Sequence, residues 1–205
     1  RAIAGDSTGL DAVSPQPSGG GIQASGGIVN EYTTPPGAVY RAHIFTSSGS
    51  FVASQNNLAY GTNVEYLLVG GGGGGGNNNS PGHGGNGGAG AGGLVEGDAL
   101  PITVGATYTI KIGGGGTGGA KSPGMPAPHR NGFPSTISSP VTTTLTAKGG
   151  GGGGLDSGDS ISSGPGVGNG GGIAGSDPTN NPNGSPGGQP GTNSLYGATD
   201  YGNAG

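Results

Sequence analysis

The sequence contains no cysteine and no tryptophan, and only 8% of its 205 residues are charged. Without cysteine, no disulfide can support the fold. The six Lys and Arg residues are scattered along the whole chain, which argues against nucleic-acid binding. No apolar run approaches the ~18 residues that cross a bilayer, so we expect no membrane insertion.

Apolar side chains are also scarce, whereas glycine is abundant. Hydrophobic residues make up 28% of the chain, which contains 56 Gly and 16 Pro. Ordering a glycine costs more backbone entropy than ordering any other residue, and a glycine brings no side chain to offset that cost. Backbone hydrogen bonds and neighbouring copies must therefore stabilise these segments. We expect a homo-oligomer that completes a core too small for one chain.

Five stretches are rich in Val, Ile, Thr, Tyr and Phe, and most are bounded by Gly, Pro or Asn, as is typical of strands. They are residues 28–34, 38–54, 63–69, 100–112 and 134–148. No stretch of ten residues has helical periodicity. The expected fold class is mainly β, with essentially no α-helix: a small β module joined to glycine-rich extended layers.

Two stretches alternate clearly enough to predict which face is buried. In residues 38–45, the face with Tyr40, Ala42 and Ile44 is more uniformly apolar than the face with Arg41 and His43, and should point inward. In residues 106–112, Tyr108, Ile110 and Ile112 share one side, and Thr107, Thr109 and Lys111 share the other.

The glycine runs lie at definite places. Residues 70–76, 113–116 and 149–154 each follow a predicted strand, and a weaker run covers 170–172. Polyglycine can form an extended left-handed helix with about 3 residues per turn and about 3.1 Å per residue. Because glycine keeps its N–H, such helices can bond laterally. We therefore predict polyglycine-II-like segments that pack backbone against backbone.

These patterns divide the chain into three parts. Residues 1–27 show no sustained period and read as an extended linker or stalk connection. Residues 28–154 form the glycine-rich β domain. Residues 155–205, rich in Gly, Pro and Asn, are expected to be loop or a polyglycine extension.

Motifs that suggest chemistry have simpler explanations. "GGGGTGGAKS" nearly matches a phosphate-binding loop, but Ala120 stands before Lys121 where the pattern needs Gly, and prolines follow where a helix should start. Asp156 and Asp159 resemble calcium-binding Gly/Asp repeats, but the motif occurs once, so we interpret them as solvated turn acids.

Metal binding and catalysis lack support as well. His43, His83 and His129 are far apart and have no second ligand at a short fixed spacing. No strained nucleophile elbow and no pair of carboxylates suited to glycoside hydrolysis can be identified. We therefore expect no enzyme, no cofactor and no metal.

Two clusters and one further histidine are candidate surface contacts. His129, Arg130 and Asn131 lie in "MPAPHRNGFP", and Tyr196 and Tyr201 lie in "SLYGATDYGN". Aromatic faces beside hydrogen-bonding groups on loops suit sugars and other polar ligands. Ordinary turn residues are the alternative. His83, in the loop after the longest glycine run, is the sixth candidate.

The strands and glycine runs together resemble a known family. "YRAHIFTSSGSFVAS", "VEYLLVGGGGGGG", "GGNGGAGAGGL", "YTIKIGGGG" and "TLTAKGGGGGG" occur in the order of the glycine-rich domain common in bacteriophage tail fibres and related receptor-binding proteins. The resemblance covers about residues 28–154. It implies a virion protein, typically a trimer, in which polyglycine helices form a rigid scaffold and loops at the tip contact the bacterium.

A shorter resemblance competes with it. "HGGNGGAGAGGL" is similar to the Gly-Ala repeats of mycobacterial surface proteins, but it covers a dozen residues and lacks the strands. We therefore expect a non-enzymatic fibre component or adhesin of a virion that binds a bacterial surface glycan or outer-membrane protein. The alternative is a secreted or cell-surface filament subunit, in which residues 28–69 pair with neighbouring copies and no receptor exists.

Overall fold

The computed structural model describes residues 21–55, 62–76, 88–118, 131–139, 142–153 and 199–201. The described residues contain β-strands and no helix, which confirms the predicted mainly β class. The strands are β1 (Gln23–Ser25), β2 (Ile28–Thr34), β3 (Ala38–Ile44), β4 (Gly49–Gln55), β5 (Asn63–Val69), β6 (Leu94–Pro101), β7 (Thr107–Lys111), β8 (Ser135–Ser139), β9 (Thr142–Ala147) and β10 (Thr199–Tyr201).

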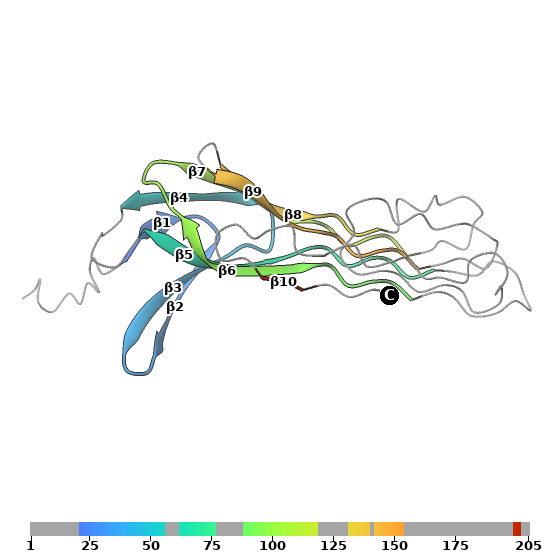
Figure 1. The fold of residues 1–205 in the computed structure, drawn as a ribbon, viewed down its shortest axis with the longest axis horizontal. Helices are drawn as coiled ribbons and strands as arrows, with labels where there is room; N and C mark the ends of the chain where they lie inside the picture. The colour runs from blue at the N-terminus through green and yellow to red at the C-terminus, as the bar shows by residue number, and fades with distance from the viewer. Residues whose placement is uncertain are drawn as a thin grey trace, which may run out of the picture.

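The described strands form three sheets, and their paired strands are antiparallel. A five-stranded sheet has the order β1-β4-β7-β8-β9, and a three-stranded sheet has the order β10-β6-β5. These two sheets form a sandwich at one end of the molecule, and β2 and β3 form a separate hairpin that projects from it (Figure 1).

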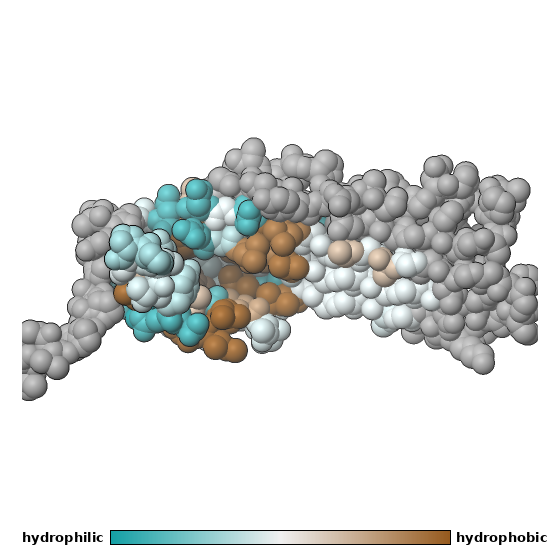
Figure 2. Space-filling view, turned by 90° about the horizontal axis from the view of Figure 1, so that it is seen from below, coloured by the Kyte–Doolittle hydropathy of each residue, from teal (hydrophilic) through white to brown (hydrophobic). Residues whose placement is uncertain are grey.

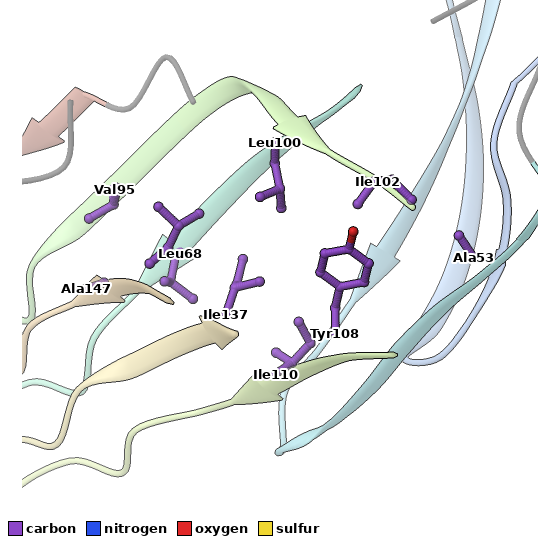
Figure 3. Close-up of a cluster of buried hydrophobic side chains, with 10 residues drawn as sticks. Ala53, Leu68, Val95, Leu100, Ile102, Tyr108, Ile110, Ile137 and Ala147 are labelled. Carbon is purple, nitrogen blue, oxygen red and sulfur yellow. The ribbon is translucent and has the colours of Figure 1, made fainter. Parts of the chain in front are cut away.

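The small core lies between the two sheets (Figure 3). Leu68 of β5 and Val95 of β6 come from the three-stranded sheet, and Tyr108 of β7 and Leu145 of β9 come from the five-stranded sheet. The remaining buried hydrophobic residues are Ala53, Leu100, Ile102, Ile110, Ile137 and Ala147. Two sheets that each bury one face need few large side chains, which explains how so apolar-poor a chain forms a core.

Several sequence predictions are confirmed. The strand at residues 28–34 coincides with β2, and the stretch 63–69 coincides with β5. Tyr108 and Ile110 are buried, whereas Thr107, Thr109 and Lys111 are exposed, as the alternation of residues 106–112 predicts.

The prediction for the other alternating stretch is wrong. Tyr40 and Ile44 of β3 are exposed by 41% and 45%, although their face was expected to point inward. The physical reason is that β3 pairs only with β2 in the described sheets, and the hairpin stands away from the sandwich (Figure 1). Alternation identifies the apolar face but does not say whether the chain itself covers it.

Three strands lie where the sequence did not predict them. β1 falls inside the expected linker, β6 follows the "GAGAGG" stretch, and β10 falls in the expected C-terminal loop region. β6 contains Gly97, Asp98 and Pro101, all residues disfavoured in strands. Its pairing with both β5 and β10 compensates for this weak local preference.

The link from β1 to the hairpin depends on two glycines in the left-handed region. Gly26 has φ of 113° and Gly27 has φ of 66°. The carbonyl oxygen of Gly26 lies 2.8 Å from Nδ1 of His43, and the His43 ring meets the edge of Phe51 with centroids 5.1 Å apart. This turn and these contacts attach the root of the hairpin to the sandwich.

Candidate functional site

Five glycine-rich segments run side by side away from the sandwich, and we call them the glycine bundle (Figure 1). Residues 70–76, 113–118 and 148–153 leave the sandwich after β5, β7 and β9. Residues 88–93 and 131–134 return to it before β6 and β8. The bundle is therefore a direct continuation of the central strands, as the positions of the glycine runs predict.

Hydrogen bonds between the segments advance by three residues at a time. Gly70 and Gly73 donate their N–H groups to the carbonyl oxygens of Gly93 and Gly90, at 2.8 and 2.9 Å. The same step recurs where Gly90 and Gly93 donate to Gly151 and Lys148, and where Gly150 and Gly153 donate to Gly71 and Gly74. A step of three is what a helix with about three residues per turn requires. The polyglycine II conformation itself stays a prediction.

The same bonds show that the bundle is three-dimensional. Segments 70–76, 88–93 and 148–153 each bond to the other two. In a flat sheet, the two outer members of three neighbouring chains cannot bond to each other, because the middle one separates them. Segments 113–118 and 131–134 add to this arrangement through Gly116 donating to Gly72 and Phe133 donating to Gly114. The bundle thus uses lateral bonds in several directions.

The packing leaves no space for side chains at most positions of the central run. A Cβ added at Gly70, Gly71, Gly73 or Gly74 would lie well under 3.0 Å from a backbone carbonyl oxygen, closer than real Cβ atoms approach. Gly72 has only an ordinary contact at 3.9 Å. Side chains therefore fit only on the outside of the bundle, where Ala89, Ala91 and Thr117 are indeed exposed.

Two polar side chains hold the bundle in place. Ser135 of β8 is fully buried, and its Oγ accepts a hydrogen bond of 2.9 Å from the N–H of Gly113, the first glycine after β7. Asn131 Oδ1 accepts one of 2.8 Å from the N–H of Gly152. Sequence reasoning did not identify either role, because the partners lie 22 and 21 residues away along the chain.

The candidate surface contacts are only partly placed. His83, His129, Arg130 and Tyr196 lie outside the described residues. Asn131 is half-buried and serves the bundle through the bond to Gly152.

Of the remaining candidate residues, the structure places one differently from the prediction. Tyr201, expected on a loop beside Tyr196, belongs to β10, where it is paired with Leu94 at the base of the bundle. Tyr201 and Asn131 therefore belong to different elements, β10 and the glycine-rich segment 131–134. Lys121, Asp156 and Asp159 also lie outside the described part of the chain.

The described surface is uneven in hydropathy. Figure 2 shows hydrophobic surface gathered at the sandwich end, whereas the bundle is nearly uniform and of intermediate hydropathy. Among the described residues, no group of three His, Cys, Asp or Glu side chains could hold a metal ion. Within that same part of the chain, no helix is long and apolar enough to cross a membrane.

Comparison with known proteins adds one finding. A family model described as a glycine-rich domain matches residues 46–205, which include the sandwich strands from β4 onward and the whole bundle. No curated protein and no solved structure matches the chain. The strands β1, β2 and β3 precede the matched residues.

Proposed function

This chain belongs to the glycine-rich domain family, and we propose that it is a non-enzymatic structural component of a bacteriophage fibre that acts as an adhesin. In this proposal the protein is a homo-oligomer of the virion, with a trimer favoured. Its loops recognise a bacterial surface glycan or an outer-membrane protein. The observation that carries the proposal is the glycine bundle, with its three-residue register of lateral hydrogen bonds.

The bundle suits a mechanical role. Each segment is held by hydrogen bonds to at least two others, and backbones approach too closely for side chains at Gly70, Gly71, Gly73 and Gly74. A segment cannot bend alone without breaking bonds to its neighbours. This supports a rigid, extended element of the kind that a fibre needs.

The topology also supports recognition at the end of the bundle. Gly76 and Gly88 flank the stretch that contains His83, and Gly118 and Asn131 flank the stretch that contains His129 and Arg130. Segments 70–76 and 113–118 run away from the sandwich, and their successors return to it. The two stretches therefore start and finish at the far end of the bundle. In the proposed fibre, this end is the one that contacts the receptor.

The first experiment measures the particle mass in solution by light scattering and images the same sample in negative stain. We expect an elongated particle with a small fixed number of chains. Open-ended filaments would contradict the fibre proposal and favour an extracellular filament subunit. The exposed Ile28, Leu67 and Val69 are the observation that favours this second candidate, because they offer apolar contacts within residues 28–69.

The recognition part needs its own measurement, namely binding of the purified protein to bacterial cells and to a glycan array. Arg130→Ala should weaken binding tenfold or more, because it removes a charged donor from the expected contact region. Lys111→Ala is the matched control, since it removes one positive charge from the exposed face of β7. Equal binding by both variants would contradict a contact role for Arg130.

A further inference from the structure

The hairpin of β2 and β3 has an unusual amount of exposed apolar surface for an element with so little support. Ile28 is exposed by 62%, Tyr32 by 46%, Tyr40 by 41% and Ile44 by 45%. An isolated two-stranded hairpin is at best marginally stable in water, and a third strand or a packing partner is normally needed. In the described residues, the hairpin pairs with no third strand.

The strand register separates the two faces of the hairpin. Ile28 lies opposite Ile44, and Tyr32 lies opposite Tyr40, with the two rings stacked at 5.4 Å. Because alternate residues share a face, these four side chains lie on one side, which we call the outer face. The other residues on this face are Asn30, Thr34, Ala38 and Ala42, so the outer face carries no charge.

The opposite face is mixed: Val29 and Val39 are exposed there by 49% and 52%, beside the charged Glu31 and Arg41, and its root contacts the sandwich. Arg41 lies opposite Glu31 and forms an ion pair with it at 3.4 Å. Arg41 also donates a 2.9 Å hydrogen bond to Gln23 of β1, and the His43 ring contacts Phe51 of β4. Within the described residues, the chain therefore contacts this face only near its root and places a charged pair on it, whereas the outer face carries neither charge nor a contact of this kind.

We infer that the outer face is where copies of this chain pack against one another around the symmetry axis of the oligomer. Around such an axis, every copy presents the same patch, so the patch must be able to pack against identical patches. An uncharged face of isoleucines and tyrosines meets this condition. The inference rests on the proposed function only in requiring more than one copy.

Comparison with another exposed apolar surface supports a second copy of the chain as the partner of the outer face. Leu67 and Val69 on the outward side of β5 are exposed by 62% and 51%. Glu65 and Asp98 are exposed around them, in a chain with a net charge of -4. Identical copies meeting there would place carboxylates against carboxylates, which is unfavourable. The outer face of the hairpin avoids this conflict, because its residues carry no charge.

The available area sets how strongly the copies would bind. The four large side chains offer on the order of 400 Å² per copy, taking roughly 200 Å² for a fully exposed large side chain and about half of that as exposed. A stable interface buries about 800 Å² per partner. The outer faces thus supply about half of a stable interface, and other surfaces must complete it. A single unfavourable substitution there should dissociate the assembly.

The test compares Tyr40→Lys and Tyr40→Glu with Thr33→Lys, which places the same charge on the opposite face of the hairpin. Particle mass is measured by light scattering at micromolar concentration and low salt. We expect each Tyr40 variant to raise the dissociation constant tenfold or more and to approach the single-chain mass of 19.0 kDa. Thr33→Lys should keep the mass of the unsubstituted protein.

A mixture of the two Tyr40 variants distinguishes loss of the contact between copies from misfolding of the chain. Equal amounts of the Tyr40→Lys and Tyr40→Glu chains should associate again, because opposite charges then meet at the axis. Failure of the mixture to associate, or dissociation of Thr33→Lys as well, would overturn the inference. Tyr40 variants of normal mass would overturn this inference alone. If the unsubstituted protein itself has the mass of a single chain, both the inference and the oligomeric part of the proposed function are overturned. The outer face would then belong to a different partner.

Discussion

Gly73 and Gly151 lie back to back in the glycine bundle, so closely that a Cβ added at Gly73 would overlap the carbonyl oxygen of Gly151. Gly70 stands in the same relation to Lys148, three residues earlier on both segments. The repeat of three thus governs steric exclusion as well as hydrogen bonding. Within residues 70–76 it separates glycines at which an added Cβ would clash with backbone from glycines that have space for one.

Gly73→Ala should lower the free energy of unfolding by about 1–3 kcal/mol, because the methyl group must displace backbone rather than a flexible side chain. Gly73→Val should abolish assembly. Gly72→Ala is the matched control in the same run, and it should leave stability unchanged or raise it by about 0.4–1 kcal/mol through the unfolded state. Denaturant unfolding measures the difference. Equal effects at Gly72 and Gly73 would refute the close packing.

Ser135→Ala should destabilise the junction of sandwich and bundle. The change leaves the N–H of Gly113 without its acceptor beside a fully buried side chain, at a cost of about 1–3 kcal/mol. Ser135→Thr keeps the hydroxyl but adds a methyl group to a packed site. Amide hydrogen exchange at Gly113 reports on the bond directly, and unchanged protection in Ser135→Ala would contradict its role.

Asn131 is predicted to support the bundle rather than only to contact a receptor. Asn131→Ala removes the acceptor of the Gly152 N–H and should cost about 1–3 kcal/mol. Asn131→Asp retains a side-chain oxygen at that place and should preserve most of the stability. Thermal unfolding of the two variants separates the roles. If Asn131→Ala weakens cell binding without lowering stability, the contact role is the correct one.

Tyr108 should contribute through its hydroxyl group as well as its ring. The hydroxyl donates to the Pro101 carbonyl at 3.0 Å and accepts the Thr103 N–H at 2.9 Å, so it fixes the chain directly after β6. Tyr108→Phe should therefore cost about 0.5–1.5 kcal/mol. Tyr32→Phe, on the exposed outer face, is the control and should change the unfolding midpoint little. If Tyr108→Phe leaves the free energy of unfolding unchanged, water replaces these bonds.

Local patterns predicted those strands whose own residues favour them. β2, β5 and β7 combine β-branched and aromatic residues with a clear boundary, and the side chains of Tyr108 and Ile110 alternate with Thr109. β6 was not predicted because it contains Gly97, Asp98 and Pro101, which are disfavoured in strands. β10 was not predicted because it has only three residues. Their formation depends on pairing with segments far away along the chain, and no local window contains that information.

The sequence by itself determined the β class, the alternation of β7 and the places where glycine backbone replaces side chains. These features depend on local backbone geometry, which residue type controls directly. Only the tertiary structure decided that segments 70–76, 88–93 and 148–153 bond in a triangle, that Asn131 reaches Gly152, and that Tyr40 faces outward. Such relationships depend on which segments become neighbours in space. A glycine run carries no side-chain pattern that could specify its neighbours, so the packed strands at its ends must set them.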